Sequence, residues 1–410
     1  MKVCVVGSGG REHALAMVLA RTAEVVVTPG NPGIPGSVDT PAEAIDADLF
    51  VVGPEQPLVD GLADDLRAQG KLVFGPGADG ARLEGSKAFM KEVVAAAGVP
   101  TARYADFDDP DEAIAFLDTL PAGPDGGYVI KTDGLAAGKG VLVTTDRAEA
   151  ETDIREKLAG DSFGDAGRRV VIEERMVGPE LSVLAVCDGQ WAVALDPAQD
   201  YKRVGDGDQG PNTGGMGCYS PVPAADAALV ERVLAEFVEP TLAELRARGI
   251  DYRGVLYAGL MLTGEGPKLV EYNVRFGDPE SQVVLPRLTS DLAQLLAEAA
   301  AGDLRSEPTF SDDACVAVAC AAEGYPTSTR TGDVIEGLDR LDDLEGVEVL
   351  FAGVAAGGSG ALVTAGGRVL YVCGTAPDIE QARALAYQGV ARIGWPGMHH
   401  RSDIAAHPTI

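Results

Sequence analysis

The stretch from Leu269 to Glu280 combines residue types whose spacing could support phosphoryl chemistry. Its alternation predicts a strand on which Leu269, Glu271 and Asn273 share one face and apolar residues share the other. Two hard oxygen donors one pleat apart suit Mg²⁺, which takes few protein ligands and completes its shell with water and nucleotide phosphates. Arg275 continues the same face, where its guanidinium fork could hold a carboxylate or a phosphate. An edge strand with an ordinary polar face would alternate in the same way. The choice between a metal site and a solvent-exposed face therefore depends on the upstream segments.

A glycine-rich hairpin upstream indicates nucleotide binding. Two predicted strands, 128–131 and 141–145, flank the loop 132–140, and Lys131 and Lys139 bracket that loop. Loop amides and two ammonium groups could together bind a triphosphate. The loop is not a Walker A motif, because the spacing from Gly134 to Gly138 is one residue short and Gly140 replaces the Ser or Thr after the lysine. A simple glycine hairpin is the alternative.

Two further segments could complete a nucleotide site. A predicted strand 169–174 ends in Glu173 and Glu174, and a hinge then leads to Glu180 and the next strand, 181–187. Such a hinge could offer backbone groups to an adenine and a carboxylate to the ribose, although a solvated strand end would explain Glu173 and Glu174 nearly as well. The long polar loop 196–217 carries Asp200 and Lys202, and loops of this length are usually functional or disordered.

The elements that must position these residues begin with a βαβ unit. A strand (2–6), the glycine turn 7–10, a helix (11–21) and a second strand (24–28) follow one another. A dinucleotide site is not expected, because Glu12 stands where the third glycine would be and no acidic residue ends the second strand. The turn could bind a sugar phosphate at the helix N-terminus, or it could merely connect strand and helix. Loops after strand ends also carry Gly10, Asn31, Gly33, Gly53, Pro54 and Glu55, where ligands collect in open α/β sheets.

Composition narrows the class of protein. A chain of 410 residues is long enough for two to four domains. The formal net charge of −30 argues against a nucleic-acid partner, and no apolar run is long enough to span a bilayer. Six cysteines form no C-x-x-C pair, and the chain opens as a strand rather than as a signal peptide. We therefore expect a soluble cytoplasmic protein with reduced thiols.

At this point the motifs resemble a known family, the phosphoribosylamine–glycine ligases. The segments that carry the likeness are 7–14 (GSGGREHA), 52–59 (VGPEQPLV), 83–87 (LEGSK), 131–140 (KTDGLAAGKG), 212–217 (NTGGMG) and 271–280 (EYNVRFGDPE). They occur in order over nearly the whole chain. The resemblance implies a multidomain α/β and α+β chain with the ATP-grasp fold. The expected parts are a Rossmann-like substrate domain (1–86), a nucleotide domain (87–302) with a mobile small lobe (about 109–169), and a small α+β cap (303–410).

The resemblance also implies ATP and Mg²⁺ or Mn²⁺ as cofactors, glycine and 5-phosphoribosylamine as substrates, and a monomer that forms a C–N bond in purine biosynthesis. Carried over by position, it assigns the residues as follows: Lys87, Lys131, Gly138 and Lys139 near the ATP phosphates; Glu173, Glu174, Met176 and Val177 at the adenine; Glu180 at the ribose; Glu271 and Asn273 at the metal; Gly10, Asn31, Gly33, Pro54 and Glu55 at phosphoribosylamine; and Arg275, Lys202 and Asp200 at the glycine carboxylate and the transferred phosphoryl group.

Two departures from the family pattern limit this assignment. The segment between Gly33 and Ala47 is short, so its usual helix must be very short or absent, and Tyr201 stands where a histidine is often found. We therefore give Tyr201 no role in proton transfer. Two other functions remain open: a carboxylate–amine ligase of the same fold with another substrate, and a nucleotide sensor without catalysis.

Overall fold

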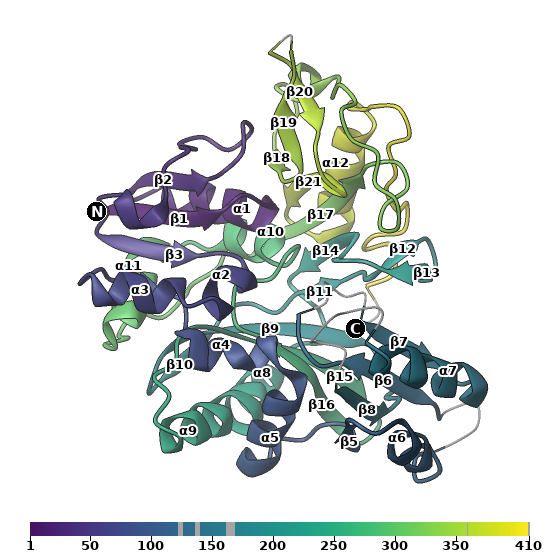
Figure 1. Ribbon diagram of the computed structural model, residues 1–410. Coiled ribbons are helices and arrows are strands. Elements are labelled where there is room, and N and C mark those ends of the chain that lie inside the picture. The colour runs from purple at the N-terminus through teal and green to yellow at the C-terminus, as the bar shows by residue number, and fades with distance from the viewer. Residues whose placement is uncertain (122–125, 136–139, 161–168, 359, 409–410) are drawn as a thin grey trace.

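The N-terminal part of the chain is a parallel four-stranded sheet. The computed structural model describes residues 1–121, 126–135, 140–160, 169–358 and 360–408 (Figure 1). The strand order is β2-β1-β3-β4, and the elements are β1 (Lys2–Gly7), α1 (Gly10–Leu19), β2 (Glu24–Pro29), η1 (Ala42–Ala44), β3 (Leu49–Val52), α2 (Glu55–Val59), α3 (Leu62–Ala68), β4 (Val73–Phe74) and α4 (Ala78–Gly85). The predicted βαβ opening is confirmed, and the crossover before β3 is indeed reduced to the three-residue turn η1. Between β3 and β4 the chain forms two short helices, α2 and α3, which are separated at Gly61, a residue with φ +92°.

An antiparallel sheet of order β10-β9-β15-β16 forms the centre of the molecule. Its elements and the helices packed on it are α5 (Lys87–Ala97), β9 (Glu180–Asp188), β10 (Ala192–Ala194), α8 (Ala227–Val233), η3 (Leu234–Val238), α9 (Glu239–Ala247), β15 (Arg253–Thr263), β16 (Gly266–Asn273) and α11 (Leu292–Ala301). Alternating side chains of β9 serve two cores: Val183 packs with residues of α5 and α9, and Val186 packs with residues of α11. The helical segment before β15 runs from Ala227 to Ala247 with a π-helical turn, η3, in its middle.

A smaller antiparallel sheet, β5-β8-β6-β7, lies beside the central sheet (Figure 1). It is built from β5 (Tyr104–Phe107), α6 (Pro110–Leu117), β6 (Tyr128–Thr132), β7 (Val141–Thr144), α7 (Arg147–Leu158) and β8 (Val170–Glu174). Ile130 and Ile172 on one face of the sheet pack against Ile154 of α7. The opposite face of β6 presents Val129 and Lys131 to a large cavity.

The C-terminal sheet, of order β11-β14-β17-β21-β18, draws strands from two distant parts of the chain. It and its neighbours comprise β11 (Gln199–Asp200), β12 (Arg203–Gly205), β13 (Gln209–Asn212), β14 (Gly217–Ser220), α10 (Ser281–Val284), η4 (Leu285–Arg287), β17 (Ala314–Ala321), η5 (Leu338–Arg340), β18 (Val347–Phe351), β19 (Val354–Ala356), β20 (Leu362–Thr364), β21 (Arg368–Ala376) and α12 (Ile379–Val390). The loop expected over 196–217 therefore contains short strands, and β14 begins within it. Local pattern could not reveal them, because β14 pairs with β17, about a hundred residues later.

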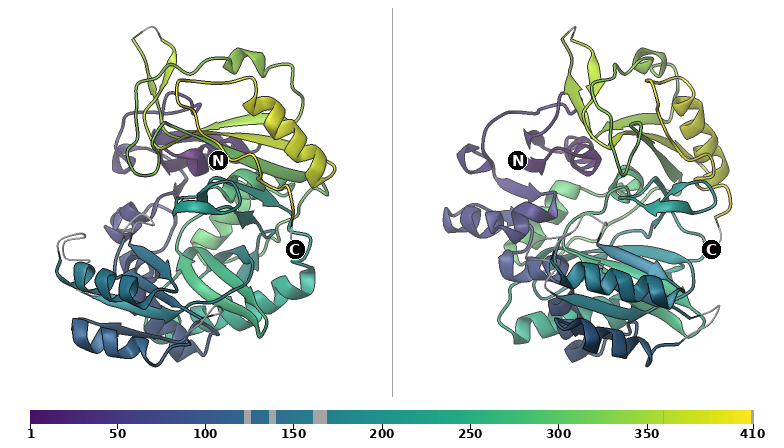
Figure 2. Two further views of the ribbon diagram at one scale, coloured as in Figure 1. Left: turned by 90° about the vertical axis from the view of Figure 1, so that its right-hand side faces the viewer. Right: turned by 45° about the vertical axis from the view of Figure 1, so that its right-hand side comes forward.

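The N-terminal and C-terminal sheets lie side by side on one side of the molecule, opposite the central and small sheets (Figure 2). None of the helices in the described part of the chain is both long enough and apolar enough to cross a membrane.

Candidate active site

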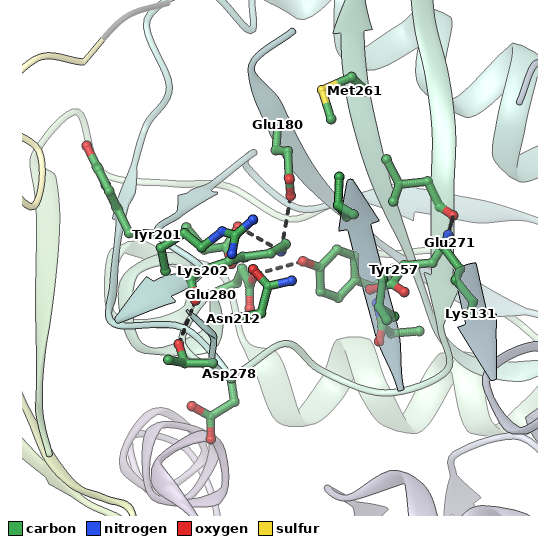
Figure 3. Close-up of a pocket in the computed structure, with 18 of the residues that line it drawn as sticks. Lys131, Glu180, Tyr201, Lys202, Asn212, Tyr257, Met261, Glu271, Asp278 and Glu280 are labelled. Carbon is green, nitrogen blue, oxygen red and sulfur yellow. Dashed lines mark hydrogen bonds and ion pairs between the residues drawn. The ribbon is translucent and has the colours of Figure 1, made fainter. Parts of the chain in front are cut away.

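One cavity of about 1110 Å³ is lined by residues from every part of the fold. Glu55 comes from the N-terminal part, Lys131 from the small sheet, Glu271 from the central sheet and Arg368 from the C-terminal sheet. In Figure 3, Lys131 lies beside Glu271, while Lys202 lies among Glu180 and Glu280. The cavity thus places cationic and anionic groups within one enclosure.

A β-bulge in β16 sets the orientation of the oxygen pair. Gly259 pairs with Glu271 and Leu260 pairs with Leu269, so Val270 has no partner in the ladder. Because the bulge resets the alternation, Leu269 points into the apolar core, and the expectation that it shares a face with Glu271 is wrong. Glu271 and Asn273, two residues apart beyond the bulge, both line the cavity as expected.

The environment of Glu271 fits a hard divalent cation. Burial raises the pKa of this carboxyl, but the ammonium groups of Lys131, Lys202 and Lys87 outweigh that effect and hold the pKa below its ordinary value. The carboxylate is therefore ionised at neutral pH. Asn273 adds an amide oxygen, Oδ1, which accepts a hydrogen bond of 3.1 Å from Arg275 Nη2. This pair of oxygen donors suits Mg²⁺ or Mn²⁺ better than a soft metal.

Lys131 is held from two sides in the wall of the cavity. Its Nζ lies 2.9 Å from Glu173 Oε1 and donates to the Val270 carbonyl at 3.2 Å, the carbonyl of the bulged residue. Burial lowers the pKa of Lys131, but Glu173 and Glu271 raise it by more, so the ammonium stays charged. Glu173 is 2% exposed, and the same oxygen lies 3.2 Å from Lys91 Nζ. The sequence did not single out Lys91, because it lies inside an ordinary amphipathic helix.

The other expected nucleotide residues are distributed around the same cavity. Lys87 Nζ donates to the Gly134 carbonyl at 3.1 Å, and Met176, Glu174 and Glu180 line the cavity. Val177 is 54% exposed at the hinge. Gly138 and Lys139, expected at the phosphates, lie outside the described residues.

Lys202 lies among several carboxylates. Its Nζ is 2.9 Å from Asp200 Oδ2 and 3.3 Å from Glu180 Oε2. Burial lowers the pKa of Lys202, but these carboxylates raise it well above its ordinary value. Glu280, which the sequence analysis left without a role, accepts a 2.7 Å hydrogen bond from the Tyr257 hydroxyl, and burial raises the pKa of its carboxyl.

Arg275 forms ion pairs with two carboxylates from the N-terminal part of the chain. Its Nη2 lies 2.9 Å from Glu84 Oε1, and its Nε lies 3.3 Å from Glu55 Oε2. Glu84 Oε2 also accepts the backbone N–H of Val274 at 2.8 Å. Arg275 therefore ties the end of β16 to the N-terminal part while it lines the cavity.

Most of the residues expected at phosphoribosylamine contact the C-terminal part. A Cβ on Gly10 would lie 2.5 Å from the Tyr371 ring, and a Cβ on Gly33 would lie 2.3 Å from that of Phe351. Asn31 Nδ2 donates to the carbonyls of Ser8 at 2.8 Å and of Ala352 at 3.1 Å. Pro54 is the N-cap of α2, and Glu55, which follows it, lines the cavity.

Two comparisons with known proteins identify the fold of the middle part of the chain. Residues 85–281 match the model of the ATP-grasp (A) domain of phosphoribosylglycinamide synthetase. The biotin carboxylase domain of 2-oxoglutarate carboxylase from Hydrogenobacter thermophilus, solved with MgADP, shares the fold with a TM-score of 0.73 at 17% identity over 97% of this chain and 91% of that one. The nucleotide-binding part of the chain is therefore an ATP-grasp fold.

The family follows from the rest of the chain. Residues 1–84 match the N domain of phosphoribosylglycinamide synthetase, and residues 315–407 match its C domain. The chain is 49% identical to the phosphoribosylamine–glycine ligase of Streptomyces coelicolor over 99% of both chains. It is 48% identical to that of Caulobacter vibrioides over 98% of this chain and 97% of that one. The crystal structure of the Thermotoga maritima ligase superposes with a TM-score of 0.84 at 35% identity, covering 98% of this chain and 100% of that one. The chain belongs to the phosphoribosylglycinamide synthetase family.

Proposed function

We propose that the chain ligates glycine to 5-phosphoribosylamine with ATP, giving glycinamide ribonucleotide, ADP and phosphate in de novo purine biosynthesis. The observation that carries this proposal is a cavity that joins the Glu271–Asn273 oxygen pair and Lys131 to groups from the N-terminal and C-terminal parts. The family match over all three parts of the chain supports the same activity. An ATP-grasp ligase of the same fold with another carboxylate or amine is the alternative.

The nucleotide end of the cavity lies between the small and central sheets. We assign Lys87 and Lys131 to the phosphates of ATP, together with Gly138 and Lys139 by resemblance. The hinge from Glu173 to Val177 offers backbone groups to the adenine, and Glu180 accepts the ribose hydroxyls. Glu173 also holds Lys131 in place through its 2.9 Å ion pair.

Glu271 and Asn273 would hold Mg²⁺ or Mn²⁺, whose chemistry is to neutralise phosphate charge during phosphoryl transfer. The residues fit this role, because Glu271 is kept ionised by neighbouring lysines and both oxygen donors line the cavity.

The reaction proceeds in two steps in this proposal. A glycine carboxylate oxygen attacks the γ-phosphorus of ATP in line, so that ADP leaves and glycyl phosphate forms. The amine of phosphoribosylamine then attacks the acyl carbon and loses a proton, and phosphate leaves. Arg275 orients the glycine carboxylate and stabilises charge on the transferred group, with Lys202 and its ion-pair partner Asp200 nearby.

The remaining assignments concern the second substrate and the state of the protein. Gly10, Asn31, Gly33, Pro54 and Glu55 would form the phosphoribosylamine wall, of which Glu55 reaches the cavity. We also propose three domains with the boundaries predicted from the sequence, and a cytoplasmic monomer. The six buried free thiols are compatible with a reducing compartment.

The test is ADP release by the purified protein with ATP and Mg²⁺, with glycine and freshly generated phosphoribosylamine added separately and together. Turnover that requires both substrates supports the ligase. ADP release that needs neither substrate, or that accepts another carboxylate in place of glycine, refutes the named reaction.

A further inference from the structure

Lys91 is a buried lysine that the proposed mechanism does not use. It lies on α5 with 0% exposure, behind the cavity wall rather than in it. Its Nζ is 3.2 Å from Glu173 Oε1 and donates to Thr101 Oγ1 at 2.8 Å, and it lies 5.0 Å from the centre of the Tyr104 ring. Burying an ammonium group costs free energy, so a buried lysine needs compensation from its partners.

The contacts of Lys91 converge on one carboxylate. Glu173 Oε1 pairs with Lys91 at 3.2 Å and with Lys131 at 2.9 Å. Lys131 faces the cavity, whereas Lys91 lies on the far side of Glu173. Two ammonium groups and one carboxylate leave this cluster with a net charge of +1, and Lys131 is the member that can present it to a ligand.

Removing Lys91 would therefore change the charge that the cavity presents. Glu173 and Lys131 alone would form a neutral pair, and Lys131 would attract a polyphosphate less. We propose that Lys91 is a positioning residue that shares the negative charge of Glu173, so that the Lys131 ammonium acts on the nucleotide phosphates with its positive charge uncancelled. This inference rests on the proposed nucleotide role of Lys131.

The surroundings of Lys91 are compatible with a charged amine at neutral pH. Burial lowers its pKa to about 8, while Glu173 raises it, Lys131 lowers it and Glu271 raises it. From the strand packed against it, Tyr104 contributes a phenol whose pKa is raised, so this group is uncharged. Lys91 should thus carry its charge at pH 7 and lose it as the pH rises through 8.

Charge complementation provides the test. Binding of adenylyl imidodiphosphate with Mg²⁺ is measured by calorimetry on the full chain at pH 7.0. Lys91→Met should weaken binding about tenfold, a loss that one charge interaction at the effective dielectric of a protein can produce. Adding Glu173→Gln restores the net charge of +1 and leaves an amide oxygen for Lys131, so the double variant should bind more tightly than Lys91→Met. A merely structural role of Lys91 would not be rescued in this way.

Lys157 is the matched control, because it is a lysine 4% exposed in the small lobe that pairs with Asp153 in its own helix. Lys157→Met should bind the analogue as wild type does. A second readout is pH: raising it from 7.0 to 9.0 should weaken binding to wild type more than it weakens binding to Lys91→Met. Lys87, whose pKa burial also lowers, is common to both proteins and cancels in the comparison.

Undiminished binding by Lys91→Met, or a double variant no better than the single one, would overturn the inference. If Lys91→Met does not fold, Lys91→Arg provides the test: it keeps the positive charge and should bind within about threefold of wild type, and a tenfold loss refutes the idea. Because the readout is nucleotide binding, the inference can hold in a protein that fails the glycine-dependent ADP assay.

Discussion

His13 links the N-terminal helix α1 to the C-terminal sheet through one hydrogen bond. The Phe351 N–H donates to His13 Nδ1 at 2.8 Å, and the two rings stack with centroids 5.8 Å apart. Burial lowers the pKa of His13 to about 4, from an ordinary value of 6.5. The neutral imidazole is therefore the form that fits between these two parts of the molecule.

We expect this histidine to make the protein sensitive to acid. In the unfolded chain His13 binds a proton below pH 6.5, whereas in the folded chain it does so only below about pH 4. The free energy of unfolding therefore decreases as the pH drops through this range. The loss from this group approaches roughly 3 kcal/mol at pH 4. Thermal melts at stepped pH should show a weaker dependence for His13→Gln, which keeps an acceptor for Phe351. Equal pH dependence in both proteins would contradict the assignment.

Glu271 carries the prediction about the metal. Glu271→Gln should lower kcat/KM by about a hundredfold or more and raise the Mg²⁺ concentration needed for half-maximal activity, because a charged ligand becomes neutral. Glu265→Gln, on the exposed turn of the same hairpin, is the control and should leave both quantities unchanged. Full activity of Glu271→Gln with normal metal dependence would remove the metal assignment.

The C-terminal segment 399–405 holds the β12–β13 hairpin, which follows Lys202, through hydrogen bonds and ion pairs. We call this set of contacts the clamp. Arg401 is 1% exposed, and its guanidinium pairs with Asp208 at 2.7 Å and Asp403 at 2.6 Å. His399 Nε2 lies 2.8 Å from the Val204 carbonyl, and the Tyr201 hydroxyl accepts the Ala405 N–H at 3.0 Å. Tyr201 thus has a structural role in anchoring this segment.

Removing the clamp should loosen the hairpin. Arg401→Met removes the guanidinium from two partly exposed carboxylates, and we expect a destabilisation of about 1–2 kcal/mol. Hydrogen exchange of the backbone amides in 203–212 should accelerate. Arg305→Met, which removes an exposed arginine paired with Asp303, should change neither quantity. Unchanged exchange in Arg401→Met would show that the hairpin holds its position without the clamp.

At the scale of the whole molecule, the net charge of −30 predicts a response to salt. Mutual repulsion among acidic groups destabilises the folded state, and salt screens it. We expect Tm to rise by roughly 2 °C between 0.05 M and 1 M KCl, equivalent to about 1–2 kcal/mol. A Tm that is flat or falls over this range would show that repulsion does not limit stability.

The three-part organisation is also a property of the whole molecule. The family matches change at residues 84 and 85, close to the boundary predicted at 86. The C-terminal sheet, however, includes β11 and β14 from the nucleotide-binding part. The C-terminal part therefore completes its sheet with strands supplied by the preceding part, and the domain boundaries given above stay a prediction.

The family, the ATP-grasp fold and most of the regular elements could be predicted from the amino-acid sequence alone. Lys131, Glu271, Asn273 and Lys202 could also be predicted as site residues. The patterns that indicate them are local in the sequence: glycine-rich loops, alternation, and charged residues a few positions apart. These residues meet in one cavity as their motifs suggested.

The neighbours of these site residues could be identified only from the folded structure. The bulge at Val270, the pairing of β14 with β17 and the carboxylates that grip Arg275 all depend on partners distant in the sequence. Lys91 shows the same limit, since it reads as one more residue of an amphipathic helix until Glu173 folds against it. Spacing along a chain specifies which groups can act, whereas packing sets the charge and orientation with which they do so.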